Sequence, residues 1–481
     1  MSEKHRKYLR FQFGQKTYQF NALPYGLSVA PRVFTKIMRE VVNHLRHRGF
    51  KSVIFLDDLL CVGDSYEECN LNVTETINLL KCLGFVINYD KSVLVPQKEC
   101  KFLGFMLNTS SMSIYLPIDK KLRILDLVKK HLKLPTCTIR EVSQLIGTLT
   151  SACPAIKYGW LYTKEIERQK YLALKKSNSY ETKVRLPDTI LPDLRWWEQN
   201  IMNSENSMRP DENFKLEIFS DASRTGWGGY CNGSRVHGSW KQDELVSHIN
   251  YLELLAVFLS LKCFAKSMSH CSLLLRIDNT TAISYVNRMG GIQFPHLNKL
   301  AKDIWQWCEM RRIWLFASYI NTKENKEADQ ESRRLNCDTE WQLSQWAFEH
   351  IVDTFGQPEV DLFASRTNAK CSRFVSWKPD PDASAVDAFT ICWGTSYFYA
   401  FPPFSVILRC LRKIVTDRAT GIFVFPYWPG QPWFPLLKKM LASEIIFFQP
   451  HVDLLQSCSR SVHPLHQSLT LGAAKLSGLP S

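Results

Sequence analysis

Hydrophobic and polar residues alternate along the chain in two periods, which predict a mixture of strands and helices. The runs Ser52–Leu56 and Leu59–Val62 are short and apolar, as strands are, and Glu67–Leu83 has the spacing of a helix. Residues 136–212 are basic and predicted to be helical before they become rich in Ser, Asn and Pro. The first part of the chain therefore mixes short strands with helices.

The next part has the clearest order of elements. Residues 214–335 read strand, strand, strand, helix, strand, helix, helix, strand, helix. Asn250–Ala265 repeats apolar residues at helix spacing, and Ser272–Ile277 is apolar throughout, which is typical of a buried central strand. These residues are therefore predicted to form an α/β domain.

Helices then alternate with short buried strands up to about residue 450. The predicted strands are Val360–Phe363, Ser396–Phe401, Gly421–Tyr427 and Glu444–Phe448. That alternation favours a parallel α/β unit. Residues 451–481 are polar with Gly and Pro, and are predicted to be a tail.

The composition and net charge indicate what kind of partner the protein binds. The chain has 481 residues, 45% of them hydrophobic and 22% charged, which is typical of folded globular domains. Its net charge of +14 favours polyanions such as nucleic acid. The 15 cysteines are odd in number and lack zinc-site spacing, so we expect reduced thiols. Neither a signal peptide nor a membrane span is expected, which predicts an intracellular protein.

Acidic residues follow several of the predicted elements between residues 214 and 335. Asp221 ends the strand Lys215–Ser220, Asp278 ends Ser272–Ile277, and Glu253 and Asp329 lie on helices. Acids brought together in this way repel one another unless cations neutralise them. Two Mg²⁺ or Mn²⁺ ions about 4 Å apart would activate a water and stabilise the leaving oxygen of a phosphodiester. The alternative is that each acid is a helix cap or a solvated surface charge.

These residues stand in motifs that resemble the RNase H domain of retroelements. The motifs are Phe219–Ser223, Gly226–Gly229, Tyr251–Leu254, Arg276–Ala282 and Asn325–Asp329. The resemblance implies a mixed five-stranded sheet and hydrolysis of the RNA strand of RNA–DNA hybrids. It also implies that Asp221, Glu253 and Asp278 are the core metal ligands, that Asp329 is the fourth, and that Asn279 binds substrate. Many such domains carry a His in the loop before the last carboxylate, but residues 321–326 have none, which bears on product release.

A second pair of acids, Asp57 and Asp58, lies between two apolar runs near the start of the chain. Paired aspartates are also common in ordinary turns. Leu23–Phe34 precedes them, and Gly84-Phe85, Lys91 and Phe102–Phe105 follow. This order resembles the palm of reverse transcriptases, with Leu56-Asp57-Asp58 in place of Tyr-x-Asp-Asp. The resemblance implies that Asp57 and Asp58 bind metal, and that Pro24, Gly26, Ser28 and Lys91 bind substrate.

The resemblance also implies an N-terminally truncated palm. A palm uses a further Asp on an earlier strand, and the only acid before Leu23 is Glu3. Because removing one carboxylate from a two-metal site abolishes most activity, we expect weak or absent polymerase activity. The basic stretch 120–170 would correspond to thumb and connection, which hold the duplex backbone through Lys and Arg.

A third resemblance lies in residues 337–450. Glu359–Ser365, Tyr399–Phe404 and Phe425–Pro429 resemble phage-type, Dam-like adenine methyltransferases, in which an Asn- or Asp-Pro-Pro-aromatic motif holds a flipped base. Phe401 stands at the Asn position and cannot accept a hydrogen bond, so S-adenosylmethionine is not expected as a cofactor. The alternatives are a Pro-Pro turn with core aromatics, or base stacking.

Together these motifs resemble the polyproteins of DIRS-type retrotransposons. We expect an α+β multidomain chain: palm and start of thumb at 1–135, thumb or connection and linker at 136–212, RNase H-like domain at 213–336, Rossmann-like, methyltransferase-like segment at 337–450, tail at 451–481. The predicted function is ribonuclease H attached to an incomplete reverse transcriptase, with RNA–DNA hybrids, other nucleic acids and other retroelement proteins as partners. The alternatives are a non-catalytic nucleic-acid-binding remnant and active reverse transcription.

Overall fold

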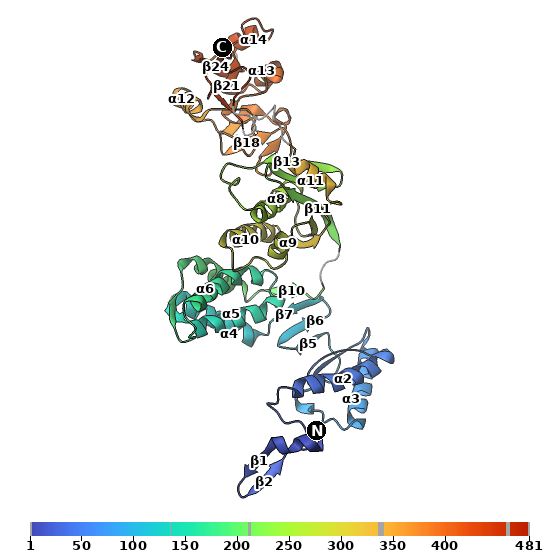
Figure 1. Ribbon diagram of the computed structural model, residues 1–481. Helices are drawn as coiled ribbons and strands as arrows, with labels where there is room; N and C mark the ends of the chain where they lie inside the picture. Colours follow the sequence, from blue (N-terminus) through green and yellow to red (C-terminus); the bar gives the residue numbers. More distant parts are fainter. Residues whose placement is uncertain (1, 135, 210–212, 335–340, 458–461, 480–481) are drawn as a thin grey trace. The chain divides into compact units, whose positions relative to one another are not determined.

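The chain forms two compact units, each with its own core (Figure 1). The computed structural model describes residues 2–134, 136–209, 213–334, 341–457 and 462–479. Residues 1–162 and 179–210 form the first unit, and residues 163–178 and 211–481 the second. Helix α6 (Lys164–Lys176), inside the block predicted at 136–212, therefore belongs to the second unit. Its Arg168 Nη1 donates a hydrogen bond to the carbonyl oxygen of Ile292 at 2.6 Å.

Two hairpins and three α-helices make the first part of the first unit. A short helix α1 (Glu3–Arg6) precedes the hairpin of β1 (Arg10–Phe13) and β2 (Lys16–Gln19). The predicted strand pair and helix are confirmed as β3 (Lys51–Phe55), β4 (Asp58–Val62) and α3 (Tyr66–Cys82), and they follow α2 (Ala30–His47). The apolar face of α2 supplies the core, because Met38, Val41 and Leu45 pack against residues of β3 and α3.

A small sheet and three helices complete the first unit. The sheet has the order β10-β7-β6-β5, and the helices bury Leu145, Leu194 and Trp197. The elements are β5 (Glu99–Phe102), β6 (Phe105–Asn108), β7 (Ser113–Tyr115), α4 (Ile118–Lys133), β8 (Thr136–Thr138), α5 (Ile139–Ala152), β9 (Lys183–Arg185), α7 (Leu191–Asn200) and β10 (Glu205–Ser207). A capping box starts α5: Thr138 accepts from the amide of Glu141, and the Glu141 carboxylate accepts from the amide of Thr138.

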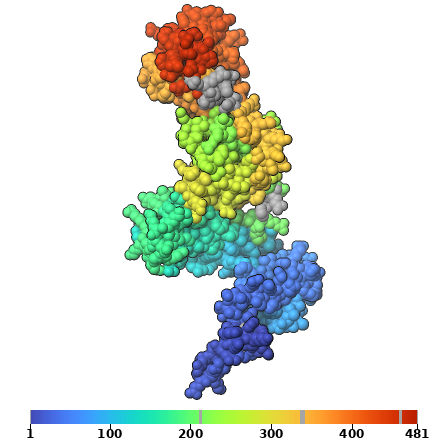
Figure 2. All heavy atoms as spheres, viewed as in Figure 1, coloured from blue at the N-terminus to red at the C-terminus, as the bar shows by residue number. Residues whose placement is uncertain are grey.

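The middle of the chain folds around a mixed five-stranded sheet in the order β13-β12-β11-β14-β15. The predicted order of nine elements is confirmed: β11 (Phe214–Ala222), β12 (Gly226–Cys231), β13 (Ser234–Ser239), α8 (Ile249–Phe264), β14 (Ser272–Ile277), α9 (Thr280–Asn287), α10 (Pro295–Glu309), β15 (Trp314–Tyr319) and α11 (Lys326–Ser332). Strands β11, β14 and β15 are parallel, whereas β12 and β13 form antiparallel hairpins. Side chains fill the space that the ribbon leaves between these helices and strands on the face in view (Figure 2).

Neighbouring glycines of β12 show that α8 and α11 cover opposite faces of this sheet. A Cβ atom at Gly229 would lie 2.5 Å from Ser260 Oγ of α8. A Cβ atom at Gly228 would lie 2.3 Å from the carbonyl oxygen of Ala328 in α11. Successive strand residues point to opposite faces, so the two helices lie on different sides. Only glycine permits backbone approach this close.

The last part of the chain forms a seven-stranded sheet in the order β19-β18-β17-β20-β21-β24-β22. The strands are β17 (Val360–Asp361), β18 (Arg373–Ser376), β19 (Ala385–Val386), β20 (Phe398–Ala400), β21 (Thr420–Pro426), β22 (Ile446–Phe448) and β24 (Leu471–Ser477). The first five of these in spatial order are parallel, as predicted, and β24 runs antiparallel to both neighbours. The helices are α12 (Gln345–Phe355), α13 (Ile407–Thr416) and α14 (Phe434–Lys439), and β16 (Gln342–Leu343) pairs with β23 (Leu455–Gln456).

The prediction of a tail at residues 451–481 is wrong, because β24 is a buried strand between β21 and β22. Its sequence is poor in large apolar residues for a packing reason. A Cβ atom at Gly472 would lie 2.8 Å from the ring of Phe425, so this strand supplies space for the aromatic rings of β21. Because its residues are small enough to leave room for these rings, the strand has a composition similar to that of a polar loop. In the part of the chain that the structure describes, we find no helix with the length and apolarity to span a membrane.

Candidate metal centre

Three acidic side chains meet at one edge of the five-stranded sheet. Asp221 is the penultimate residue of β11, and Asp278 directly follows β14, its parallel neighbour. The carboxyl ends of neighbouring parallel strands lie at the same edge, which brings the two side chains together. Glu253 reaches them from the first half of α8. One ligand oxygen of each residue lies within 4.8 Å of the others.

The cluster is buried, and burial changes its proton affinity. Asp221 is 4% exposed and Glu253 is 6% exposed. Burial, with the charges of Asp278 and Asp329 in addition, raises the pKa of Asp221 to about 6 although a hydrogen bond from Ser332 opposes the rise. Burial first, and then the charges of Asp221 and Asp278, raises the pKa of Glu253 to about 9. The carboxylates therefore compete for protons in the absence of another cation.

The donor set fits a hard divalent cation. All three side chains offer oxygen atoms, which are the ligands that Mg²⁺ and Mn²⁺ prefer. Among the described residues, the Oε2 atom of Glu253 is buried and has no hydrogen-bond partner. A buried carboxylate oxygen without a partner costs free energy that a cation would recover. The residues present thus fit the metal that the sequence predicts.

Asp329, the fourth predicted ligand, lies near this group but makes a different contact. It is on α11, and its Oδ1 atom accepts hydrogen bonds from Nη2 and Nε of Arg333 at 2.8 and 3.1 Å. Its charge contributes to the raised pKa of Asp221. The structure therefore brings three of the four acids into one cluster, and it pairs the fourth with an arginine.

Hydrogen bonds fix the side chains around Asp278. Its Oδ2 atom accepts from Thr322 Oγ1 at 2.8 Å. The predicted substrate-binding residue Asn279 caps α9 through the amide of Ala282, and its Nδ2 atom donates to Asn250 Oδ1 at 3.0 Å. Sequence reasoning missed Thr322, whose only signal is its place in the loop before α11. Substrate binding by Asn279 stays a prediction.

Helix α11 is held against the sheet by contacts that sequence reasoning also missed. Ser223 Oγ donates to the carbonyl oxygen of Ser332 at 2.6 Å, and Asn325 Nδ2 donates to that of Ser220 at 3.1 Å. His237 Nδ1 lies 2.5 Å from Glu331 Oε2, and both side chains are buried. These contacts fix the helix that carries Asp329 relative to the strand that carries Asp221.

The predicted palm acids, Asp57 and Asp58, lie in an exposed hairpin. Asp57 is in the turn between β3 and β4, Asp58 is the first residue of β4, and both are exposed. Within the described ranges, neither belongs to a group of three metal-ligating side chains. Their metal binding stays a prediction.

The predicted substrate-binding residues of the palm lie on either side of this hairpin in the sequence. Pro24, Gly26 and Ser28 lie in the turns before α2, where Gly26 has a φ of +86°. Lys91 ends a short 3-10 helix (Tyr89–Lys91) and is exposed. Their contacts with substrate stay predictions.

Comparison with known proteins finds a family model that matches the start of the chain and relatives that match across most of it. The family model "Reverse transcriptase (RNA-dependent DNA polymerase)" matches residues 1–107. The enzymatic polyprotein of Cauliflower mosaic virus (strain D/H) is 25% identical over 353 residues, which is 70% of this chain and 48% of that protein. The putative enzymatic polyprotein of Cassava vein mosaic virus is 22% identical over 373 residues, covering 71% and 51%. The chain thus spans about half the length of the curated relatives it matches.

Solved structures with some similarity include two complexes of foamy viral protease-reverse transcriptase. The complex with dsDNA has a TM-score of 0.39 and 15% identity, and covers 67% of this chain and 64% of that chain. The complex with an RNA/DNA hybrid has a TM-score of 0.39 and 16% identity, and covers 66% and 42%. The family match and the viral relatives show that this chain carries a reverse transcriptase domain related to the caulimovirus enzymatic polyproteins.

Proposed function

We propose that residues 213–334 hydrolyse the RNA strand of RNA–DNA hybrids, as a ribonuclease H attached to the reverse transcriptase domain. The observation that carries this proposal is the buried cluster of Asp221, Glu253 and Asp278, whose ligand oxygens lie within 4.8 Å of one another. The net charge of +14 supports a polyanionic substrate. The relatives are viral polyproteins that match across most of this chain, which supports the association of the two activities.

The carboxylates would hold two Mg²⁺ or Mn²⁺ ions, with Asp329 at the edge of the site. Bound ions of this kind lower the pKa of a water and neutralise charge on a phosphodiester during cleavage. The residues themselves supply the geometry: Asp221 and Asp278 are fixed by neighbouring strands, and Glu253 by α8. Thr322 orients Asp278 through its hydroxyl hydrogen bond. Asn279 directly follows Asp278 in the sequence and donates a hydrogen bond to Asn250, and side-chain amides of this kind suit the hydroxyl groups of a ribose.

Hybrid cleavage by the full chain tests this proposal. The Asp278→Asn variant removes one negative charge from the cluster and is expected to reduce Mg²⁺-dependent cleavage of a labelled RNA–DNA hybrid by about a hundredfold or more. Asp243→Asn is a matched control, because Asp243 is exposed and outside the cluster, and should cleave like the parent. Equal cleavage by the Asp278→Asn variant and the parent would show that another activity produced the cleavage.

A second candidate is a non-catalytic nucleic-acid-binding remnant. The exposed setting of Asp57 and Asp58, outside any cluster of three ligands in the described residues, favours it for the reverse transcriptase domain. This candidate predicts hybrid binding that weakens steeply with salt, without turnover. Primer extension by the parent and by an Asp58→Asn variant separates the candidates, since product made only by the parent would establish polymerase activity.

The finer assignment, to a DIRS-type element with a methyltransferase-like segment, is also a proposal. The parallel strands β17 to β21 support a Rossmann-like segment at 337–450, now extended to Ser477 by β24. Phe401-Pro402-Pro403-Phe404 directly follows β20, where such a motif would lie. Because Phe401 offers no acceptor for an amino group, we still expect no S-adenosylmethionine-dependent methylation.

A further inference from the structure

Loops of the seven-stranded sheet contact helix α8, the helix that carries Glu253, through paired polar groups. The Nζ atom of Lys262, in the last turn of α8, lies 2.9 Å from Oδ1 of Asp382. Lys266, just after the helix, donates a hydrogen bond from Nζ to the carbonyl oxygen of Ala383 at 2.7 Å. Both acceptors belong to the segment between β18 and β19. The carboxyl end of α8 is therefore attached to the seven-stranded sheet.

A buried arginine makes a second contact, at the segment that precedes α8. Arg366, in the loop after β17, donates from Nη1 to Glu244 Oε2 at 3.1 Å and from Nη2 to Glu244 Oε1. The Arg366 side chain is 8% exposed and the Glu244 side chain is 12% exposed. A bidentate pair of this kind fixes direction as well as distance, and salt screens a buried pair little. Both ends of α8 are thus held by the same sheet.

Asp382 joins the two contacts into one chain of alternating charges. Its Oδ2 atom lies 3.4 Å from Nε of Arg366, while its Oδ1 atom contacts Lys262. Burial raises the pKa of Asp382, but the hydrogen bond and charge of Lys262, and then the charge of Arg366, outweigh burial and lower that pKa. Asp382 is therefore ionised at neutral pH, and two acids and two bases neutralise one another along the chain Glu244, Arg366, Asp382, Lys262.

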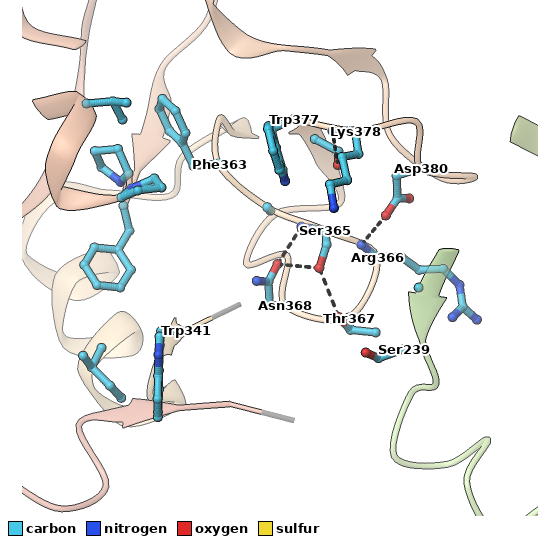
Figure 3. A pocket seen from close by; sticks show the side chains of 18 of the residues that line it. Ser239, Trp341, Phe363, Ser365, Arg366, Thr367, Asn368, Trp377, Lys378 and Asp380 are labelled. Carbon is cyan, nitrogen blue, oxygen red and sulfur yellow. Dashed lines mark hydrogen bonds between the residues drawn. The ribbon is translucent and has the colours of Figure 1, made fainter. Parts of the chain in front are cut away.

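A third carboxylate orders the loops that carry these charges. Asp380 accepts hydrogen bonds from the amide of Arg366 at 2.9 Å and from the amide of Asp382 at 3.0 Å. Figure 3, a view of the pocket beside these loops, marks the first of these bonds with a dashed line. Groups that are already ordered lose little entropy when they make a contact. The loops therefore present a rigid surface to α8.

The segment that contains Glu244 leads directly into the first turn of α8. Glu244 Oε2 also accepts from the amide of Lys241 at 2.8 Å, and the amide of Ser247 donates to the carbonyl oxygen of Glu244 at 2.9 Å. Arg224, in the turn after β11, donates from Nη1 to the carbonyl oxygen of Ser247 at 3.0 Å. The segment is thus held on one side by the turn that follows Asp221 and on the other by the seven-stranded sheet.

The carboxylate cluster depends on the placement of these first turns. Glu253 lies in the first half of α8, which begins at Ile249. Burial is the main cause of the raised pKa of Tyr251 in the same turns, and the charges of Glu244 and Arg366 also act on it. The ligand oxygens of the cluster lie within 4.8 Å of one another, and a displacement of about 1 Å in such a site can cost about a hundredfold in rate.

We propose that the seven-stranded sheet supports the carboxylate cluster, and that Arg366 is a positioning residue that fixes the first turns of α8 through Glu244. This inference rests on the proposed hybrid cleavage, because it assigns Arg366 a role in that site. It gives the seven-stranded sheet a function that requires neither a ligand nor methylation. Loss of the pair would keep all three carboxylates but weaken their hold on a metal ion.

Hydrogen exchange of the full chain, measured with and without Mg²⁺, tests this contact without relying on cleavage. Arg366→Gln leaves Glu244 buried without its partner, so exchange in the first turns of α8 should increase by about tenfold or more. The Mg²⁺ concentration that restores half of the protection should rise by about tenfold, the lower end of the range for residues that orient metal ligands. Exchange in β21 and β24 should stay unchanged, which shows that the variant is folded. Arg366→Lys keeps the charge but loses the bidentate geometry and should fall between the two proteins.

A double variant shows whether the two residues act as one unit. Glu244→Gln should have the same effect on α8 as Arg366→Gln, and the double variant should be no worse than either single variant, because the two changes remove one interaction. Arg412→Gln is the control. Arg412 is an exposed arginine of α13, outside this chain of charges, and its replacement should leave exchange in α8 and the Mg²⁺ midpoint unchanged.

Cleavage of a labelled hybrid separates this inference from the proposed function. Arg366→Gln should lower kcat by about tenfold or more at low Mg²⁺ while KM for the hybrid stays the same, and saturating Mg²⁺ should restore most of the loss. A parent without cleavage would overturn the proposed ribonuclease H activity, whereas the exchange data would still decide whether the sheet supports the cluster. Additive effects of the two glutamine changes, or unchanged α8 exchange and an unchanged Mg²⁺ midpoint in Arg366→Gln, would overturn the inference.

Discussion

Replacing Glu253 with glutamine is expected to stabilise the metal-free protein, and to do so increasingly as pH rises. Burial and the neighbouring aspartates raise the pKa of Glu253 from 4.5 to about 9. An acid whose pKa is higher in the folded state binds its proton more tightly there. The folded state therefore loses stability as pH rises from the unfolded pKa toward the folded pKa. Glutamine keeps the shape of the side chain but cannot ionise, so it removes this pH dependence.

The size of this stability difference follows from how far the pH lies above the pKa of Glu253 in the unfolded chain. A pH of about 7.5 is roughly 3 units above the pKa of Glu253 in the unfolded chain, and each pH unit corresponds to about 1.36 kcal/mol of stability. Keeping Glu253 protonated in the folded state thus costs at most about 4 kcal/mol at this pH, since water entering the cluster lowers the cost. Asp221, whose pKa is about 6, adds a smaller pH dependence that both proteins share. The parent and Glu253→Gln should be nearly equal in stability at about pH 4.5, and the difference should grow as the pH rises toward about 9, the pKa of Glu253 in the folded state.

Hydrogen exchange of α8 and β14 in the full chain, with a chelator present and corrected for intrinsic exchange, measures this difference. Protection in the parent should fall with pH while protection in Glu253→Gln stays nearly level. Added Mg²⁺ should restore the parent more than the variant. Glu324→Gln, a change at an exposed acid of the loop before α11, is the control and should follow the parent. Parallel pH profiles for the parent and Glu253→Gln would refute the electrostatic reasoning.

Three further changes test other parts of the structure. Gly228→Ala places a Cβ atom 2.3 Å from the backbone of α11, so hydrogen exchange in α11 should increase by about tenfold or more and hybrid cleavage should fall. Gly147→Ala is the control, because Gly147 lies in a helix with open space around it, and this change should be neutral or stabilising. Arg333→Gln releases Asp329 from its ion pair and should lower the Mg²⁺ concentration needed for cleavage, measured as a midpoint; an unchanged midpoint would place Asp329 outside the site. A backbone hydrogen bond, and then Lys130, lowers the pKa of Glu141 to about 2. The Glu141 carboxylate therefore stabilises α5 above pH 4.5, and this stabilisation is lost as the pH falls toward 2. Hydrogen exchange in α5 should be faster in Glu141→Gln than in the parent at neutral pH, and equal in the two proteins near pH 2.

The carboxylate cluster could be predicted from sequence because each acid lies in, or directly after, a strongly patterned element. An apolar strand that ends in an acid, next to a second such strand, determines both the place and the direction of Asp221 and Asp278. The partners of these acids could not be predicted in the same way. Thr322 and Ser332 come from loops and helix ends whose positions depend on tertiary packing, not on local pattern.

Two features of the fold were also beyond local pattern. Helix α6 follows α5 in the sequence and lies in the same block, residues 136–212, that is predicted to be helical, yet contacts such as Arg168 with Ile292 place it in the second unit. Strand β24 lacks the apolar runs of a central strand because the rings of β21 need the space. In both cases the deciding interaction joins residues that are distant in sequence.

The position of β24 has a consequence for the synthesis of the chain. Strand β22 is made before β24 but pairs only with it in the seven-stranded sheet, and β21 leaves the ribosome with one edge open. The sheet cannot close until residue 477 has emerged, so the aromatic edge of β21 stays available to other nascent chains during translation. A chaperone that covers this edge while the intervening residues are translated would raise the yield of folded protein.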